Sequence, residues 1–188
     1  MEHLTYSLEQ RLITLAEYHK MGQAGILAED ERVELLYGKI VPMSPVGSKH
    51  STCVKRLNRL FSRSVGDQAI VSVQDPIQIP DQSEPEPDVA LLSPPLATYE
   101  SRHPLPEEVM LVIEVSDSSL LKYQTVKLPL YASAGIPEVW LVDLVKQQVE
   151  VYTQPQDDIY ALRRLVRKGE VIALVALDLE VTVDEVLG

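Results

Sequence analysis

The sequence predicts a domain of the α/β or α+β class, in which helices flank a central mixed sheet. Residues 109–115 form the most apolar segment and lack alternation, which is typical of a central strand covered on both faces. Helix signals and a second apolar run at 138–144 follow, so these two strands are expected to form a right-handed parallel crossover. Short strands near 147–153, 159–166, 170–176 and 179–183 resemble an antiparallel meander.

The N-terminal third is predicted to hold two helices and a hairpin. A capping box over residues 14–17 begins a first helix, which ends near Gly25. Two short apolar runs within residues 32–41 flank the turn at 37–38, which is typical of a hairpin. Residues 48–65 are predicted to be helical, because their apolar side chains share one stripe and their basic side chains another. The apolar stripe consists of Val54, Leu57, Leu60 and Phe61.

Further strands are predicted at about 69–79 and 88–92. The helix after the central strand should end at Gly135. Pro129 lies inside this helix and has no backbone N–H to donate. The helix therefore either begins late, near Thr125, or is kinked at the proline.

Composition and charge restrict the class of protein. The net charge of −11 and the pI near 4.8 exclude a protein that coats nucleic acid or anionic membranes non-specifically, although a local basic face remains compatible. With Cys53 as the single cysteine, disulfide frameworks and multi-cysteine zinc sites are excluded. The N-terminus lacks a signal-peptide pattern, and no apolar run approaches about 18 residues. We therefore expect a cytoplasmic protein without membrane attachment.

An acidic side chain lies within the most apolar segment of the chain. Glu114 is one residue from the carboxyl end of the predicted central strand, the end at which sites form in open α/β sheets. A buried carboxylate without a partner is unfavourable. Two partners lie on neighbouring segments: Asp88, at the start of another apolar strand, and Lys127, on the following helix.

These residues allow two interpretations. In the first, Asp88, Glu114 and the backbone carbonyl of Val115 supply the oxygen ligands that Mg²⁺ prefers. Such a metal would polarise a phosphoryl oxygen and acidify a bound water, while Lys127 would orient or deprotonate that water or stabilise charge on the phosphate. In the second, Glu114 and Lys127 form a buried ion pair and Asp88 is a turn residue. Spacing alone leaves both interpretations open.

Several motifs follow one another in order along the chain. They are ELLYG at 34–38, the stretch 43–50, EPDVA at 86–90, LVIEVS at 111–116, KLPLYA at 127–132 and GIPEVWLVD at 135–143. Together they closely resemble the Uma2 family, restriction-endonuclease-like proteins that are abundant in cyanobacteria and were long filed as a domain of unknown function. The resemblance covers about residues 12–183, the expected core of a single domain spanning 1–188.

The Uma2 family is assigned to the PD-(D/E)xK nuclease superfamily, which implies a restriction-endonuclease-like core and metal-dependent phosphodiester hydrolysis. By this resemblance Asp88 is the acid of the PD half-motif and Glu114 the acid of the ExK half-motif. The lysine of that half-motif would stand where this chain has Ser116, and in Uma2-like sequences it has migrated to the next helix, here to Lys127. Glu34 matches an additional upstream acid, as a further metal ligand or a water-mediated contact.

Two further positions bear on the resemblance. Gln74 matches a frequent polar residue of the family on the strand before Asp88, and is expected to line the pocket. Family members often carry an aspartate four residues before the helix lysine, but this chain has Tyr123 there. The expected site therefore lacks that acid and keeps the metal pair.

The predicted helix at 48–65 is basic and contains no acid. Its basic face either contacts the phosphates along a nucleic acid or is an ordinary solvent-exposed helix face. Its candidate phosphate contacts are Lys49, Arg56, Arg59 and Arg63. For His50, near its start, the functional interpretation is that it faces the pocket or binds phosphate, and the alternative is a capping or surface residue. Cys53 is expected in the core, and Trp140 in the core or at a dimer interface.

We therefore expect a Mg²⁺- or Mn²⁺-dependent endonuclease acting on DNA, with RNA or a branched nucleic acid as the alternative substrate. In it Asp88 and Glu114 bind the metal, Lys127 assists the water or the phosphate, and Glu34 supports the site. A homodimer is expected, because the two strands of a duplex call for two active sites. The alternative is a non-catalytic DNA-binding or protein-interaction module that retains the nuclease fold, which the charge of −11 favours.

Overall fold

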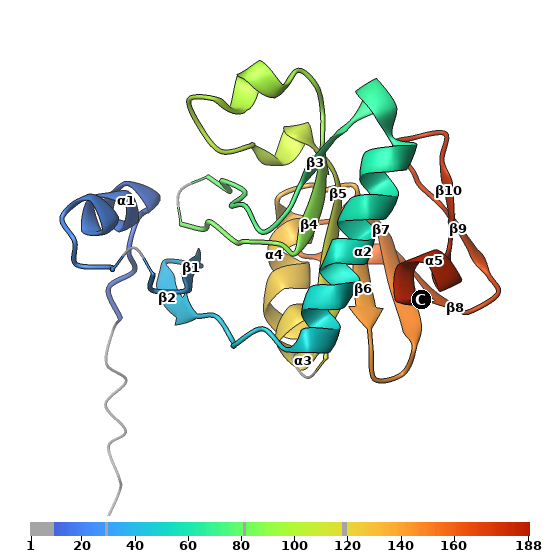
Figure 1. The fold of residues 1–188 in the computed structure, drawn as a ribbon. Coiled ribbons are helices and arrows are strands. Elements are labelled where there is room, and N and C mark those ends of the chain that lie inside the picture. The colour runs from blue at the N-terminus through green and yellow to red at the C-terminus, as the bar shows by residue number, and fades with distance from the viewer. Residues whose placement is uncertain (1–9, 29, 81, 118–119) are drawn as a thin grey trace, which may run out of the picture.

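A mixed sheet organises the computed structural model, which describes residues 10–28, 30–80, 82–117 and 120–188 (Figure 1). Within these residues the sheet has six strands in the order β3-β4-β5-β6-β7-β8, and of the neighbouring pairs only β5 and β6 are parallel. The strands are β3 (Ile70–Ser72), β4 (Val89–Leu92), β5 (Val109–Ser116), β6 (Glu138–Asp143), β7 (Gln148–Gln156) and β8 (Ile159–Arg167). The predicted class, helices around a central mixed sheet, is confirmed.

The apolar segment becomes the central strand β5. Its register with β6 pairs Val112 with Val139 and Ser116 with Asp143, so the predicted parallel pairing is confirmed. Because β5 has neighbours on both sides and helices over both faces, nearly all of its side chains are buried. The connection to β6 runs through α3 (Leu120–Lys122), a π-helical turn (Tyr123–Lys127) and α4 (Leu128–Ser133).

This connecting helix is continuous but irregular, which excludes the late start near Thr125 and supports a distortion at Pro129. Pro129 cannot bond back to the carbonyl one regular turn earlier. The chain widens into a π-helical turn just before it, in which the Leu128 N–H donates to the Tyr123 carbonyl. At the other end Gly135 adopts a φ of 76° and closes a Schellman motif, so the helix ends where the sequence predicts.

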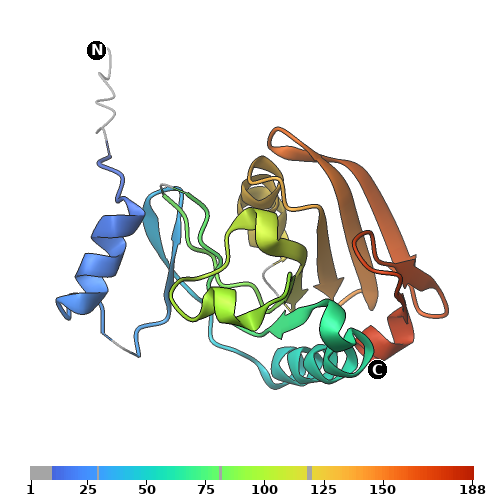
Figure 2. The same cartoon turned by 90° about the horizontal axis from the view of Figure 1, so that it is seen from above.

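Helices cover both faces of the sheet (Figure 2). On one face lie α2 (Ser48–Ser64) and α5 (Val183–Leu187), and α4 lies on the other. The Phe61 ring of α2 packs 5.9 Å from the Trp140 ring of β6, measured between ring centroids. Trp140 and Cys53 are both buried in this core, as predicted. Among the described helices, none combines the length and the apolar composition that a membrane crossing requires.

The N-terminal elements form a small lobe beside the main sheet (Figure 1). They are α1 (Leu15–Gln23), β1 (Val33–Leu36) and β2 (Lys39–Pro42). The capping box of Thr14 and Glu17 is present, and the hairpin turn lies at Tyr37 and Gly38, as predicted. Both turn residues have positive φ, and a β-carbon at Gly38 would lie 2.7 Å from the Cβ of Leu12. Glycine at this position therefore lets the hairpin approach the chain that precedes α1.

Two predicted strand regions differ from the structure. The strand expected at 69–79 is limited to β3, because Gln74 adopts a φ of 55° and turns the chain away. The predicted four-stranded meander is also wrong: β9 (Val171–Ala173) and β10 (Glu180–Thr182) pair with each other and not with β8. This separate hairpin carries buried Ile172 and Val181 onto the core beneath α2 and α5. Short 3₁₀ helices occupy Gly66–Gln68, Leu96–Tyr99 and Pro106–Glu108.

Candidate active site

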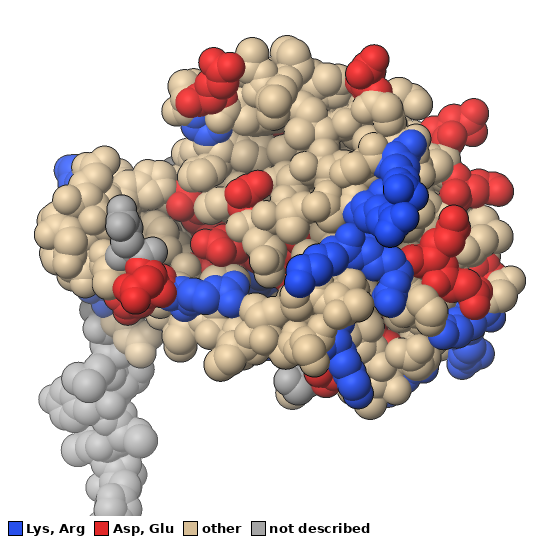
Figure 3. Space-filling model, viewed as in Figure 1, with Lys and Arg blue, Asp and Glu red and all other residues tan. Residues whose placement is uncertain are grey.

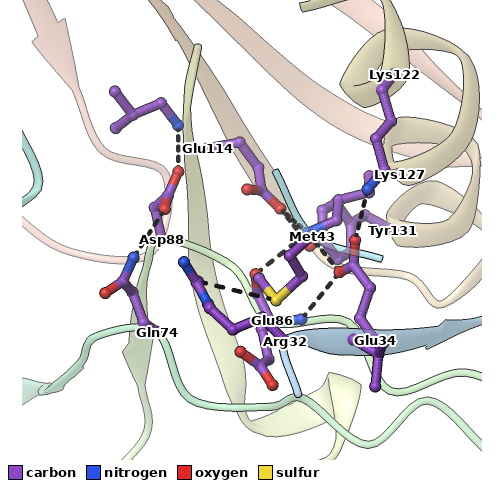
Figure 4. A network of polar contacts seen from close by, with 12 residues as sticks. Arg32, Glu34, Met43, Gln74, Glu86, Asp88, Glu114, Lys122, Lys127 and Tyr131 are labelled. Atoms are coloured by element: carbon purple, nitrogen blue, oxygen red, sulfur yellow. Dashed lines mark hydrogen bonds and ion pairs between the residues drawn. The ribbon is translucent and has the colours of Figure 1, made fainter. Parts of the chain in front are cut away.

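Polar side chains from distant segments meet in a cavity at the carboxyl end of β5. The cavity has a volume of about 180 Å³ and is bounded by the β1–β2 hairpin, the start of α2, the start of β4 and the helix after β5. Its walls include the predicted residues Glu34, His50, Gln74, Asp88, Glu114 and Lys127. Figure 4 shows how most of these side chains point toward one another.

Asp88 stands just before β4 and is tied to three other segments. Its Oδ2 accepts the N–H of Val115 at 2.8 Å and contacts His50 Nε2 at 2.9 Å. Its Oδ1 lies 3.5 Å from the side-chain nitrogen of Gln74, whose backbone N–H donates to the Asp88 carbonyl at 3.2 Å. The N–H and C=O of a residue in an extended strand point to the same side, so the Val115 carbonyl points to the side of β5 on which Asp88 binds the Val115 N–H. Asp88 is thus more than a turn residue.

His50 reaches Asp88 because of its position on α2. At 3.6 residues per turn, His50 lies on the same face as Val54 and Leu57, which pack against the sheet. The hydrogen bond to Asp88 raises the pKa of His50, burial opposes this, and the negative charges of Asp88 and Glu114 add to it. Its Nδ1 is buried and has no hydrogen-bond partner among the described residues. His50 therefore faces the cavity, and phosphate binding by it stays a prediction.

Glu114 is deeply buried in the cavity wall, with 1% of its surface exposed. Its Oε1 accepts hydrogen bonds from Lys127 Nζ at 3.0 Å and from the Tyr131 hydroxyl at 2.7 Å. Burial raises the pKa of Glu114 to about 7; the positive charge of Lys127 opposes this shift, while the charges of Asp88 and Glu34 increase it. Whether Glu114 carries a negative charge therefore depends on cations beside it, such as Lys127.

Lys127 lies between two carboxylates. Its Nζ is 3.0 Å from Glu114 Oε1 and 2.9 Å from Glu34 Oε2, and it donates to the Glu86 carbonyl at 3.2 Å. Burial disfavours the charged form, but the charges of Glu114 and Glu34 outweigh it and raise the pKa of Lys127. The predicted ion pair between Lys127 and Glu114 is thus present, and it lines the same cavity as Asp88.

Glu34 of β1 holds the lysines of the connecting helix. Its Oε1 lies 3.0 Å from Lys122 Nζ, and its Oε2 lies 2.9 Å from Lys127 Nζ and 3.4 Å from the N–H of Glu86. Both oxygens are therefore engaged by cationic side chains. The structure gives Glu34 the place of a counter-ion, and metal binding by Glu34 stays a prediction.

Sequence reasoning missed the contributions of Lys122, Tyr131 and the Glu86 carbonyl. Tyr131 follows Lys127 by four residues, a spacing that puts both side chains on one helix face and signals their common target. Lys122 precedes Lys127 by five residues, which is the wrong spacing for a regular α-helix. Both reach Glu34 because the π-helical turn lies between them.

Tyr123, at the position where the family resemblance leads us to expect an aspartate, also lines the cavity. Lys127 Nζ lies 5.6 Å from the centroid of its ring, within the range of a cation–π contact. The aromatic face therefore adds to the contacts of the Lys127 ammonium group without adding a negative charge.

The oxygen donors of the cavity suit a hard divalent cation. Mg²⁺ commonly uses one or two carboxylates and completes its coordination with water and phosphate oxygens. Asp88 and Glu114 bring two carboxylates of this kind to the cavity wall, and metal binding by them and by the Val115 carbonyl stays a prediction. Within residues 10–28, 30–80, 82–117 and 120–188, no group of three or more His, Cys, Asp or Glu side chains is arranged to hold a metal. The residues thus fit a water-rich magnesium or manganese site and not a cage built from protein ligands alone.

The basic side chains of α2 fall into two groups. Lys49, Arg59 and Arg63 are exposed. Arg56 instead donates to the carbonyl of Leu187 at 2.6 Å and to that of Val186 at 3.3 Å. Arg56 therefore caps the end of α5, which differs from the role in phosphate binding that the sequence suggests for it.

A comparison with protein-family models matches Uma2, described as "Putative restriction endonuclease", over residues 15–184. The chain belongs to the Uma2 family. The resemblance expected from the sequence motifs is therefore confirmed over nearly the whole chain, and the matched span contains every residue assigned above to the cavity.

The fold of this Uma2 protein is also found in a solved structure. The crystal structure of "a putative nuclease belonging to DUF820" from Anabaena variabilis ATCC 29413 is similar with a TM-score of 0.69 and 18% sequence identity. The alignment covers 93% of this chain and 97% of that chain. It supports the predicted restriction-endonuclease-like core of a mixed sheet flanked by helices. A comparison with curated proteins gives no match.

Proposed function

We propose that this Uma2 protein is a metal-dependent endonuclease that hydrolyses phosphodiester bonds in DNA, of the PD-(D/E)xK type with its lysine on the following helix. One observation carries the proposal. Lys127 comes from the helix after β5, yet its Nζ lies 3.0 Å from Glu114 in the cavity that also holds Asp88. The acid–acid–lysine set is thus assembled although Ser116 occupies the usual lysine position. Membership of a family described as "Putative restriction endonuclease" and a fold shared with "a putative nuclease" support the same reaction.

Asp88, Glu114 and the Val115 carbonyl would hold the Mg²⁺ or Mn²⁺ ion. When bound, such an ion polarises a phosphoryl oxygen and makes a water molecule more acidic. The protein's own hydrogen bonds prepare these ligands: Val115 and His50 fix one oxygen of Asp88, and Tyr131 fixes one oxygen of Glu114. Orientation of this kind lowers the entropy that must be lost at the moment of reaction.

Lys127 supplies positive charge beside the place where a phosphate would enter. Glu34 and Glu114 hold it as an ammonium group, so its role in this state is to attract and orient a phosphate or an attacking water. Glu34 in turn acts through Lys127 and is a positioning residue. Because Glu34 belongs to the β1–β2 hairpin, the N-terminal lobe contributes directly to the geometry of the site.

Plasmid cleavage with purified protein tests this proposal. Supercoiled plasmid is incubated with Mg²⁺, with Mn²⁺ and with a chelator, using the wild-type protein and the variants Asp88→Asn, Glu114→Gln and Lys127→Met. Glu150→Gln is the matched control, since Glu150 is an equally buried, hydrogen-bonded carboxylate outside the cavity. We expect metal-dependent cutting by the wild type and the control, and its loss in the three site variants after circular dichroism has confirmed their folding.

Other outcomes assign other functions. Cutting of RNA or a branched substrate, with the plasmid left intact, would replace DNA as the substrate. Linear product formed without a nicked intermediate would support the expected homodimer, whereas nicking alone would argue for one active site per event. Equal faint cutting by all variants, with no metal dependence, would contradict catalysis and leave the non-catalytic binding module.

A further inference from the structure

The outward face of α2 carries a set of exposed cations. Lys49, Lys55, Arg59 and Arg63 are all exposed. Among the described residues none of these four forms an ion pair, although the chain has a net charge of −11. Arg102, by contrast, pairs with Glu108. A helix with four unpaired cations and no acid is therefore suited to a polyanion from outside.

These four cations form one stripe. At about 100° per residue they fall within an arc of about 120°, and Lys49 and Arg63 are about 21 Å apart along the helix axis. The opposite face of α2 is seated in the core through Cys53, Val54, Leu57 and Phe61, so the stripe is held in a fixed position. Figure 3 shows a band of Lys and Arg side chains over much of α2, with acidic side chains on the same face both toward the β1–β2 hairpin and toward α5.

The stripe begins at the cavity. Lys49 immediately precedes His50, whose ring contacts Asp88, and Gly47 and His50 both line the cavity wall. A chain of phosphates with one member at Asp88 and Glu114 would therefore meet the first turn of α2 on leaving the cavity. An acidic face of another protein offers no such reason for the stripe to start at this point.

We infer that the exposed face of α2 is the track along which the phosphodiester backbone of the nucleic acid runs on one side of the scissile bond. This inference rests on the proposed function and adds the position of the substrate path. A strand advances about 3.4 Å per nucleotide along a duplex axis, so a stripe of about 21 Å accompanies about six nucleotides. Arg56, bound to the carbonyls at the end of α5, is not part of the track.

Binding measured as a function of salt tests the track. Fluorescence anisotropy with labelled duplex DNA, single-stranded DNA and RNA of the same sequence is recorded in chelator, so that binding is separated from cleavage. The test variant is the triple substitution Lys55→Gln, Arg59→Gln and Arg63→Gln. The matched control is Lys20→Gln, Lys39→Gln and Arg167→Gln, which removes the same charge from three exposed cations outside α2.

We expect the test variant to reduce the slope of log K against log salt by about 2.7 for duplex and about 2.1 for single strands, one counter-ion contribution for each lost contact. At 0.1 M salt its affinity should fall at least tenfold, with the control close to wild type. Equal losses in both triple variants, unchanged binding by the test variant, or binding of polyglutamate in place of every oligonucleotide would each overturn the inference. The last result would identify an acidic protein partner.

The two proposals fail separately. Oligonucleotide binding that depends on α2, without metal-dependent cleavage, would keep the track and remove the nuclease. Cleavage by the test variant with wild-type KM and kcat would keep the nuclease and remove the track.

Discussion

Replacing Lys127 by Met should destabilise the protein strongly and specifically through Glu114. Glu34 keeps Lys122 at 3.0 Å when Lys127 is lost, but no other cation is hydrogen-bonded to Glu114 among the described residues. An uncompensated buried charge of this kind costs about 3–5 kcal/mol. Unfolding entropy is about 2.1 cal/mol/K per residue, so a chain of 188 residues should lose about 8–13 °C in Tm.

Two features identify Glu114 as the source of this loss. The double variant Lys127→Met/Glu114→Gln should recover most of the stability, because the orphaned charge is gone. The deficit should also shrink as the pH falls from about 8 to about 6. The pKa of Glu114 in the folded protein is raised by burial to about 7 from an ordinary 4.5, and losing Lys127 raises it further. Protonation at lower pH therefore neutralises the buried carboxylate in the variant.

Thermal and urea unfolding, followed by circular dichroism at both pH values, measure these differences. Lys146→Met is the control, because Lys146 is an exposed lysine 3.8 Å from Asp143, and it should change stability by less than about 1 kcal/mol. The reasoning is refuted if Lys127→Met is as mild as this control. It is also refuted if the double variant is no more stable than the single one.

Three smaller changes test other parts of the structure. Tyr131→Phe removes a hydroxyl that donates to a buried carboxylate and should cost about 1–3 kcal/mol in urea unfolding; no measurable loss would mean that the bond is not made. Arg56→Gln should cost about 1–3 kcal/mol because it uncaps α5, whereas Arg59→Gln on the same helix should stay within about 0.5 kcal/mol; equal effects would contradict the distinction. Gly135→Ala places a β-carbon at a φ of 76° and should lower Tm through a cost of about 1–2 kcal/mol, while Gly22→Ala, with open space in α1, should not destabilise.

Local signals predicted the fold where they agreed with tertiary packing. The capping residues before α1, the turn at Gly38 and the helix end at Gly135 all depend on chemistry within a few residues, and the structure has each of them. The pairing of β9 with β10 was not predictable in this way. Apolar periodicity identified both segments but not which neighbour each would take, since that choice depends on burial of Ile172 and Val181 under distant helices.

The site shows the same division. The apolar surroundings of Glu114 and the proline before Asp88 were visible in the sequence, and family resemblance pointed to Lys127. The π-helical turn could not be predicted. Pro129 indicated that the helix would be distorted, but it did not indicate the π-helical form that lets Lys122 and Lys127 both contact Glu34. The structural role of Arg56 was hidden for a related reason, since its partners lie more than a hundred residues away in the chain.

Direct titration with Mn²⁺ tests the central claim, that Asp88 and Glu114 form a hard-metal site beside Lys127. Binding is followed by electron paramagnetic resonance for the wild type, Asp88→Asn, Glu114→Gln and the remote control Glu150→Gln, each with and without a short DNA duplex. We predict Mn²⁺ binding by the wild type and the control, strengthened by DNA, and its loss in both site variants. Equal binding by all four proteins, or no binding by the wild type even with DNA present, would contradict the account.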